Sequence, residues 1–518
     1  MNPIKSILIV GGGTAGWLTA AFLARTLGTA RGGPQITLVE STDIGTIGVG
    51  EATFPSIKGT LAAIGIPEAE FLRESNASFK QGIRYNHWVR PPGTPSTSGQ
   101  DFYFHPFSVP SQRPNGPELL PYWLMGGAGP GVPFAEAVTL QKHVTDAMRG
   151  PKRLSDADYV GPMNYAYHFD AGRFAALLAK HGRAAGVQHV IATMERAERA
   201  EDGAIAAVHT IEAGALRADL YIDCTGFRGA LIGDALGSRF ISASHMLFND
   251  RALAMQVPYA RPDAPIAPYT IATAQECGWT WDIGLQERRG VGYCYSSRHT
   301  DDARAEQVLR EHIRRTGGDP DQLEARKLKL NVGHREAQWV RNCVAIGLSS
   351  GFLEPLESSG IGLIETGAYL LGYLLPQTDQ LESAAQHFNA MMGRRYERII
   401  DFLKLHYCLT KRTDTAYWRD NVDPASCSPA LLAQLAQWRQ RPPHRLDFFT
   451  DFEMYPPTSW QYVLYGMEFK TELSALSAAA YPRMAEARDE FATLRQVAQH
   501  ALKDLPDHRA LVEAMKQR

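Results

Sequence analysis

The sequence predicts an α/β protein in which a nucleotide-binding body is followed by a mostly helical C-terminal lobe. A glycine-rich turn lies between an apolar strand and a helix close to the N-terminus. Two later strand-like segments, 220–223 and 343–346, each lead into a glycine-containing turn. From about residue 380 the pattern is mostly helical, as in 384–403 and 431–438. We therefore expect a body over residues 1–380 and a helical lobe over 381–518.

The composition is that of an ordinary globular protein. A chain of 518 residues is too long for one compact core, so two lobes are expected. The formal net charge of −2 gives no basic surplus for nucleic acid or an anionic membrane. No apolar run approaches the roughly 18 residues of a membrane-spanning helix. The six cysteines are scattered without a C-x-x-C pair, which predicts a reduced, cytoplasmic protein without a metal site.

Residues 6–41 have the pattern of one β-α-β unit. We expect strands over 6–10 and 36–39, joined by a helix that Gly28 ends. Between the first strand and the helix lies the fingerprint Gly11-Gly12-Gly13-Thr14-Ala15-Gly16.

That strand-to-helix context makes the glycine spacing typical of a Rossmann dinucleotide site. Gly11 permits the tight turn, Gly13 lets the backbone approach a pyrophosphate, and Gly16 lets the helix pack on the strand. The amides of the helix N-terminus, at Thr14 and Ala15, then face the phosphates. Glu40 ends the second strand, where an acid binds ribose hydroxyls.

Residues 91–133 are rich in proline and glycine, and we expect a long functional loop there, inserted into the body. Its aromatic segment 102–107 (FYFHPF) argues against simple disorder.

Four further segments carry a family resemblance: 48–53 (GVGEAT), 223–227 (DCTGF), 279–283 (WTWDI) and 351–361 (GFLEPLESSGI). Together with GGGTAGW at 11–17, they resemble the flavin-dependent tryptophan halogenase family over almost the whole chain. One departure is Gly284, where many members have proline.

The resemblance implies a flavin monooxygenase-like body that binds FAD, used as FADH2. Besides the fingerprint and Glu40, it assigns cofactor contacts to Gly50, Glu51, Ala52, Met194, Asp223, Leu348 and Ile361. Only one dinucleotide fingerprint is present, so either a separate NADH-dependent flavin reductase supplies FADH2 or NADH binds without a fold of its own. The resemblance also allows a homodimer.

The implied reaction oxidises chloride or bromide to hypohalous acid and transfers the halogen to an electron-rich aromatic ring. The resemblance makes Lys80 the lysine that holds the electrophile and Glu357 the catalytic carboxylate. From the residues alone, the favoured interpretation of Lys80 is a strand-edge lysine that faces solvent, and Glu357 could be a carboxylate favoured by a helix dipole. The halide would bind the amides of Ser359 and Gly360 at a helix start.

The same resemblance assigns substrate contacts to His105, Pro106, Phe107 and Trp460. Trp279 and Trp281 share one side of a strand, where they either separate substrate from flavin or simply fill the core. In the stretch 448–454, phenylalanines stand where tryptophan-specific members have tyrosines, and Glu453 alone could hold an amine. We therefore expect indole or a substituted indole as substrate, rather than free tryptophan.

The nearest rival is a flavin-dependent monooxygenase that hydroxylates its aromatic substrate. A second rival is a binding protein that has lost its chemistry. Lys80, Glu357 and the WTWDI segment count against the first, and the presence of both Lys80 and Glu357 counts against the second.

Overall fold

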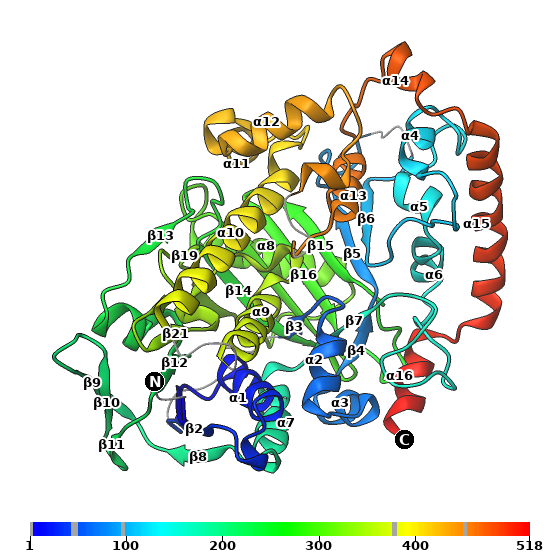
Figure 1. The fold of residues 1–518 in the computed structure, drawn as a ribbon. Helices are drawn as coiled ribbons and strands as arrows, with labels where there is room; N and C mark the ends of the chain where they lie inside the picture. Colours follow the sequence, from blue (N-terminus) through cyan, green and yellow to red (C-terminus); the bar gives the residue numbers. More distant parts are fainter. Residues whose placement is uncertain (1–3, 43–49, 95–98, 376–380, 449–452) are drawn as a thin grey trace. The chain divides into compact units, whose positions relative to one another are not determined.

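The computed structural model describes residues 4–42, 50–94, 99–375, 381–448 and 453–518. They form two compact units whose segments alternate along the chain (Figure 1). Unit 1 comprises residues 1–77, 169–244 and 330–397, and unit 2 comprises 78–168, 245–329 and 398–518. The functional division at residues 380 and 381 stays a prediction.

Unit 1 is built on a six-stranded sheet in the order β20-β21-β12-β1-β2-β8. All its neighbours pair in parallel except β20 with β21. The strands are β1 Ser6–Val10, β2 Gln35–Glu40, β8 Gln188–Ile191, β12 Leu220–Asp223, β20 Trp339–Val340 and β21 Cys343–Ala345. The structure therefore confirms the expected α/β body and both strands of its first β-α-β unit.

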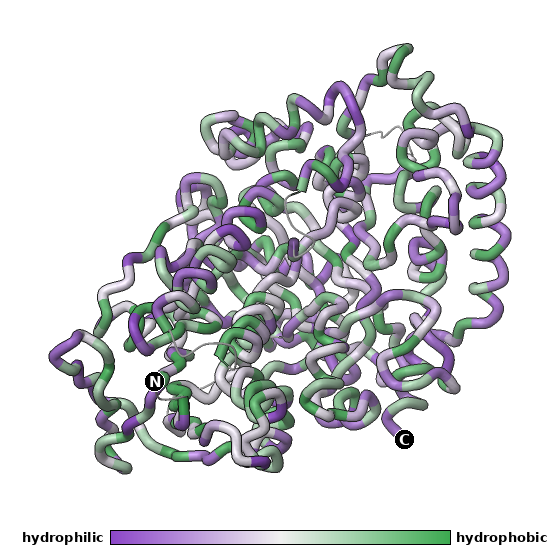
Figure 2. The backbone as a smooth tube through the Cα atoms, in the orientation of Figure 1, coloured by the Kyte–Doolittle hydropathy of each residue, from purple (hydrophilic) through white to green (hydrophobic). Residues whose placement is uncertain are grey.

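Helices of unit 1 cover this sheet because their apolar residues need a buried surface. Helix α1 (Thr14–Thr26) is buried continuously from Gly16 to Ala24, and green predominates along it in Figure 2. It packs against α7 (Ala171–Ala184) and α9 (Ser359–Leu374). The remaining elements of unit 1 are α2 Ile57–Ile64, α3 Glu68–Glu74, β3 Glu51–Ala52, β9 Met194–Arg199, β10 Ile205–Thr210, β11 Gly214–Leu216, β13 Phe240–Ser242, β19 Gly333–Arg335 and β22 Gly351–Phe352.

Unit 2 contains a seven-stranded sheet in the order β18-β14-β17-β16-β15-β5-β6. Only β5 and β15 pair in parallel. The strands are β5 Gly82–Asn86, β6 Phe102–Pro106, β14 Arg251–Pro258, β15 Thr270–Gln275, β16 Gly278–Gly284, β17 Arg288–Tyr295 and β18 Arg326–Lys329. Helix α8 (Asp302–Arg315) supplies apolar residues to the core on β14 and β17.

The helices of unit 2 confirm the expected helical character of the C-terminal part. No strand occurs in the described residues between 381 and 518. The helices are α4 Leu119–Leu124, α5 Phe134–Val138, α6 Gln141–Asp146, α11 Ala416–Val422, α12 Pro429–Trp438, α13 Pro457–Gly466, α14 Ala475–Ala479, α15 Met484–Asp504 and α16 His508–Lys516, with α10 Leu381–Cys408 running through both units.

The expectation of a long irregular loop over 91–133 is wrong in part. Residues 102–106 form β6, which pairs with β5 at the edge of the sheet. Residues 119–124 form α4. Pro106 argues against a strand in the sequence, because proline cannot donate a hydrogen bond within a sheet. It is accommodated here because it is the last residue of β6, which lies at the edge of the sheet.

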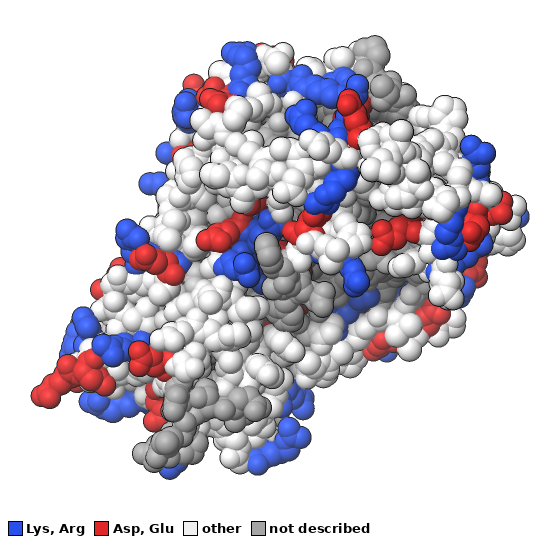
Figure 3. Space-filling model, turned by 45° about the horizontal axis from the view of Figure 1, so that its top comes forward, with Lys and Arg blue, Asp and Glu red and all other residues white. Residues whose placement is uncertain are grey.

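Charge is spread over the surface. On the face in Figure 3, the Lys and Arg side chains and the Asp and Glu side chains form small separate groups of both signs, in keeping with the net charge of −2. Among the described residues, no helix is long and apolar enough to cross a membrane.

Candidate functional site

The glycine fingerprint of unit 1 forms a turn that admits no side chains at three of its positions. Gly11 has φ +113°, and its amide donates to Val39 O at 2.8 Å. A Cβ on Gly16 would lie 1.8 Å from Gly11 O, and one on Gly12 would lie 1.7 Å from Glu40 Oε2. The strand, the turn and the helix therefore pack as closely as a dinucleotide turn requires.

Gly13 differs from its neighbours because a Cβ there would meet no atom of the described residues within 4 Å. It is the N-cap residue of α1, and no side chain from the described part of the chain caps that helix. Open space and a positive helix end at one place suit the pyrophosphate of FAD, and the contacts expected from Thr14 and Ala15 stay a prediction. The fingerprint residues therefore fit the cofactor.

Glu40 lies at the end of β2, over Gly12. Its Oε1 accepts from Trp17 Nε1 at 3.1 Å and hydrogen-bonds His189 Nε2 at 2.8 Å. Sequence reasoning missed both partners, because His189 follows Glu40 by 149 residues. They hold the carboxylate at the strand end, where a ribose would bind.

Other predicted cofactor residues lie on separate elements of unit 1. Gly347 has φ +78°, and a Cβ on it would lie 2.6 Å from Ala15 Cβ, so the turn carrying Leu348 lies against the start of α1. Burial, and then Asp170, raise the pKa of Glu51 to about 7. Glu51 and Ala52 form β3, which Gly50 precedes, and Met194 begins β9. Gly48 and Val49 lie outside the described residues.

Asp223 is buried at the end of β12, and both oxygens of its carboxylate accept hydrogen bonds from nearby residues. Its Oδ1 accepts from Thr225 N and Thr225 Oγ1 at 2.9 and 2.7 Å. Its Oδ2 accepts from Leu231 N and Ile232 N, both at 2.8 Å. The side chain therefore shapes the turn after β12, and any contact of this residue with FAD stays a prediction.

The start of α9 has the properties of an anion site. The helix begins at Ser359, after Ser358 in the left-handed conformation at φ +59°. No side chain among the described residues caps it. Among the described residues, the buried Ser359 hydroxyl has no hydrogen-bond partner, and a Cβ on Gly360 would meet no atom within 4 Å. A halide here would meet backbone amides and an available hydroxyl, and Ile361 is buried one residue further on.

Glu357 closes the short 3-10 helix Pro355–Glu357, directly before this turn, and is 2 % exposed. Its predicted catalytic role stays a prediction.

Further along α9, Glu365 is a buried carboxyl that accepts from Ser56 Oγ at 2.7 Å and from Thr60 Oγ1 at 2.5 Å. Burial raises its pKa to about 7. Because the pKa of Glu365 is higher in the folded state than in the unfolded state, this group stabilises the fold fully at pH below about 4.5. The stabilisation is lost as the pH rises through about 7.

We expect Glu365→Gln to abolish the part of the pH dependence of folding stability that Glu365 causes. At pH 8.5 the variant should be more stable than the wild type by about 2 kcal/mol, because it buries no charge. Thermal unfolding of both proteins from pH 5 to 8.5 measures the difference. Parallel curves over the whole range would contradict the raised pKa.

Lys80 ends β4 (Ser78–Lys80) of unit 2 and is 0 % exposed, so it is no solvent-facing strand-edge lysine. Its Nζ lies 5.2 Å from the centroid of the Phe107 ring. Ser78 pairs with His168 across β4 and β7 (Ala166–Phe169). Burial, and then the Lys80 ammonium, hold the pKa of His168 well below its usual range. The histidine is therefore neutral, and it hydrogen-bonds Thr270 Oγ1 at 2.8 Å.

The remaining predicted substrate residues meet at one aromatic cluster of unit 2. His105 Nε2 hydrogen-bonds Ser459 Oγ at 3.0 Å, next to Trp460 on α13. The rings of His105 and Trp460 both pack on Phe402, with centroids 6.0 and 5.1 Å away. Pro106 follows His105 at the end of β6 and pairs with Gly82. The structure thus brings His105 together with Trp460, and Lys80 together with Phe107.

Trp279 and Trp281 lie on β16, as expected, and both are buried. Their ring centroids are 6.2 Å apart, and Trp279 packs on Trp88 at 6.4 Å. A Cβ on Gly292, the cross-strand partner of Trp281, would lie 2.1 Å from the Trp281 ring. The pair is therefore built into the sheet, and its predicted screening of the flavin is untested.

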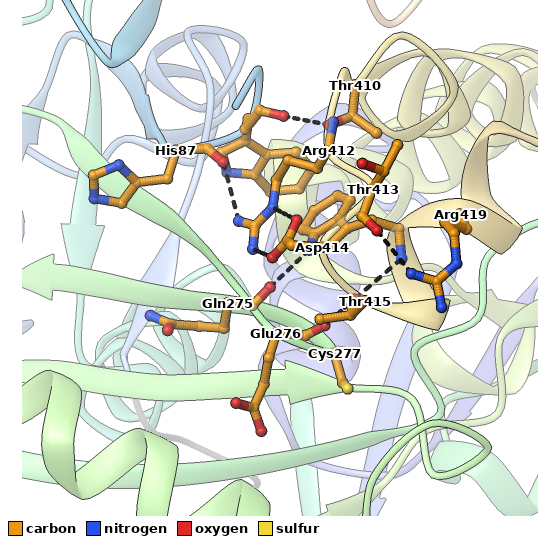
Figure 4. Close-up of polar contacts among 12 residues, drawn as sticks. His87, Gln275, Glu276, Cys277, Thr410, Arg412, Thr413, Asp414, Thr415 and Arg419 are labelled. Carbon is orange, nitrogen blue, oxygen red and sulfur yellow. Dashed lines mark hydrogen bonds and ion pairs between the residues drawn. The ribbon is translucent and has the colours of Figure 1, made fainter. Parts of the chain in front are cut away.

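The segment after α10 holds the turn between β15 and β16, a feature that the sequence did not reveal (Figure 4). Trp418 Nε1 donates to Gln275 O at 2.9 Å, and Thr415 Oγ1 donates to Glu276 O at 2.7 Å. Buried Arg412 forms two hydrogen bonds to Asp414 and stacks 4.6 Å from the Trp418 ring centroid. These contacts fix the strand that carries Trp279 and Trp281.

Arg398 is a second residue that sequence reasoning missed. Its guanidinium lies 4.6 Å from the Trp460 ring centroid and 5.5 Å from that of Phe448. Its Nε lies 3.6 Å from Glu453 Oε2. The charge of Glu453, the only predicted partner for a substrate amine, is therefore already balanced within the protein. Residues 449–452 lie outside the described part of the chain.

Comparison with known proteins agrees with this arrangement. The profile of the family described as tryptophan halogenase matches residues 6–483. The tryptophan 6-halogenase SttH of Streptomyces toxytricini is 35 % identical, over 100 % of this chain and 99 % of its own. The crystal structure of a tryptophan halogenase from Shewanella frigidimarina has a TM-score of 0.94 and 41 % identity, covering 100 % of this chain and 98 % of its own.

The flavin-dependent halogenase BrvH from a Brevundimonas species has a TM-score of 0.86 and 34 % identity, covering 99 % of both chains. Both the sequence match and the structural match therefore extend over nearly the whole chain. The chain belongs to the tryptophan halogenase family and is a flavin-dependent halogenase.

Proposed function

We propose that this enzyme uses FADH2, dioxygen and chloride or bromide to halogenate an electron-rich aromatic compound such as indole. Bound reduced FAD supplies the electrons with which dioxygen converts the halide to hypohalous acid. Lys80 holds the electrophile beside the ring that is halogenated. The observation that carries the proposal is the fully buried Lys80 ammonium, 5.2 Å from the Phe107 ring that would orient the substrate.

A buried ammonium is costly unless it has a use or a partner. In the proposed site it donates a hydrogen bond to hypohalous acid and so polarises the oxygen–halogen bond. His168, on the paired strand β7, has a pKa held well below its usual range, so it does not compete with Lys80 as a cation there. Glu357 acts as the carboxylate that accepts the proton that the ring loses.

The substrate is proposed from the aromatic cluster. Trp460, Phe402 and Phe448 offer ring contacts, each worth about 1 kcal/mol beyond burial. Arg398 already balances Glu453, so the site gains little from the amine of an amino acid. The relative SttH is named for tryptophan, whereas we propose indole or a substituted indole here.

The test combines the protein with an NADH-dependent flavin reductase, NADH, FAD, bromide and indole, followed by mass spectrometry. We propose such a reductase as the source of FADH2, since the chain has one dinucleotide fingerprint. Bromoindole is the expected product. Hydroxyindole without bromoindole would identify a hydroxylating monooxygenase instead.

The halide site makes a further prediction. Ser359→Ala removes a buried hydroxyl that has no partner among the described residues, and we expect the KM for bromide to rise about tenfold, the cost of losing a hydrogen bond to a charged group. Ser359→Thr keeps the hydroxyl and should stay near the wild-type KM. Steady-state rates against bromide concentration measure both. An unchanged KM in Ser359→Ala would show that the hydroxyl does not bind the halide and that only the backbone amides could do so.

A further inference from the structure

The first residue of α16 contacts the strand that carries Lys80. This residue, His508, is fully buried, and α16, drawn in red in Figure 1, lies beside β4. The amide of Phe79, the residue before Lys80, donates to His508 Nε2 at 3.1 Å. On the other side of the imidazole ring, His508 Nδ1 hydrogen-bonds Ile266 O at 2.8 Å. The imidazole therefore joins β4 to the segment that precedes β15, although His508 follows Phe79 by 429 residues.

These two contacts fix the tautomer of His508. A backbone carbonyl can only accept a hydrogen bond, so Nδ1 carries the proton that is donated to Ile266 O. A backbone N–H can only donate, so Nε2 is unprotonated and accepts from Phe79. Burial lowers the pKa of His508 to about 4, which keeps the ring neutral at neutral pH. Both ring nitrogens are therefore satisfied in this one state.

The contact lies at the edge of a sheet. Strand β4 is an edge strand, where it pairs with β7. Backbone groups at such an edge lack a neighbouring strand and need other partners. Here the Phe79 amide binds His508, and the Gln81 amide donates to Pro268 O at 2.7 Å. Lys80 lies between these two bonds, so its peptide planes are held on both sides.

The imidazole is itself held in place. The amide of His508 donates to Met148 O at 2.9 Å, and the amide of Gly150 donates to Pro506 O at 2.9 Å. The ring of His508 also packs on the ring of Phe79, with centroids 6.0 Å apart. The start of α16 is thus fixed from several sides, and it can hold β4 in one position.

We propose that His508 is a positioning residue for Lys80, which holds the end of β4 by accepting the hydrogen bond of the Phe79 amide. The inference rests on the proposed function of Lys80 as the residue that holds hypohalous acid. A shift of a reacting group by about 1 Å can cost about a hundredfold in rate. Loss of the contact should therefore leave bromide oxidation intact, while less of the electrophile reaches indole and more escapes as free hypohalous acid.

Two amide variants separate the two bonds of the imidazole. The side-chain amide of glutamine reaches the position of Nε2, so His508→Gln can still accept from Phe79. The amide of asparagine reaches only the position of Nδ1, so His508→Asn can still donate to Ile266 O but loses its bond to β4. Each variant removes one buried hydrogen bond, and only the second one releases the strand.

Arg509→Met is the matched control on the same helix. The guanidinium of Arg509 donates to Ala264 O and Gln286 O, which lie outside β4. This variant therefore loosens the attachment of α16 without removing the acceptor of the Phe79 amide.

The first measurement is hydrogen–deuterium exchange of the full-length protein without flavin, halide or indole, so it does not depend on halogenation. The amide of Phe79 should exchange about tenfold faster in His508→Asn, the factor expected for one lost buried hydrogen bond. It should exchange at the wild-type rate in His508→Gln and in Arg509→Met. Unchanged exchange in His508→Asn would overturn the proposal.

The second measurement compares the bromination of indole with that of a soluble dye that reacts with free hypohalous acid. In His508→Asn, indole bromination should fall about a hundredfold while dye bromination stays within about twofold of the wild type. His508→Gln and Arg509→Met should keep the wild-type ratio of the two rates. A wild-type ratio in His508→Asn, or an equal fall in Arg509→Met, would refute a positioning role.

Two further outcomes are distinguishable. A wild type that forms no bromoindole would overturn the proposed function, and with it the role of His508 in the reaction, even where the exchange of Phe79 changes as expected. If His508→Asn does not fold, His508→Phe takes its place, since phenylalanine keeps a ring against Phe79 and loses both hydrogen bonds. The same changes in exchange and in the ratio of rates are expected for it.

Discussion

Replacing Lys80 by methionine is expected to lower the rate of indole bromination about a thousandfold, within the range for loss of a positioned proton donor. Methionine has a similar length and no charge, so the fully buried position at the end of β4 should accept it. Binding of FAD should be unchanged, because Lys80 is no part of the glycine fingerprint. The measurement is the initial rate of bromoindole formation by the wild type and the variant.

The control is Lys152→Met. Lys152 is also 0 % exposed, also in unit 2, and also near an aromatic ring, with its Nζ 5.9 Å from the Tyr165 centroid. It donates to Ala157 O at 2.7 Å and has no proposed part in the reaction. Wild-type bromination by Lys80→Met would refute the role of Lys80. Equal losses in both variants would show a structural effect of removing any buried lysine.

A soluble dye that reacts with free hypohalous acid distinguishes the step at which Lys80 acts. The variant should still oxidise bromide, so bromination of the dye should continue while bromination of indole stops. Loss of both would place Lys80 before the formation of hypohalous acid.

Gly13→Ala is expected to weaken FAD binding about a hundredfold while leaving the apoprotein folded. The new Cβ meets no protein atom within 4 Å, and the backbone at φ −72° accepts alanine. The methyl group would instead enter the space proposed for the pyrophosphate, which approaches the backbone at this glycine. Quenching of FAD fluorescence on titration with apoprotein gives the Kd.

Gly59→Ala in α2 is the matched control, since a Cβ there also meets no atom within 4 Å. Its FAD affinity should equal that of the wild type. Gly16→Ala should instead yield unfolded protein, because its Cβ would lie 1.8 Å from Gly11 O. If Gly13→Ala binds FAD as tightly as the control, the pyrophosphate does not lie over this turn.

Local patterns in the sequence were enough to predict the strand β1, the turn after it, helix α1 and strand β16. Each of these depends on residues within one element or at its ends: alternation, helical spacing, and glycines where a side chain cannot fit. The resemblance to a family then assigned roles to Lys80 and Glu357, which composition and spacing did not distinguish from structural residues.

The partners that surround these residues depend on the tertiary structure. His189 hydrogen-bonds Glu40 across 149 residues, and Thr60 donates to Glu365 across 305 residues. No spacing of residues in the sequence predicts either pair, because the two members of each pair meet only when the sheet and its helices have folded.

The sequence by itself determined the α/β class, the dinucleotide turn and the family to which the chain belongs, because each is encoded in residues that are neighbours along the chain. Only the tertiary structure decided that the two units alternate along the chain and that Lys80 is fully buried. These features arise from burial and from contacts between distant segments, and no local spacing of residues records them.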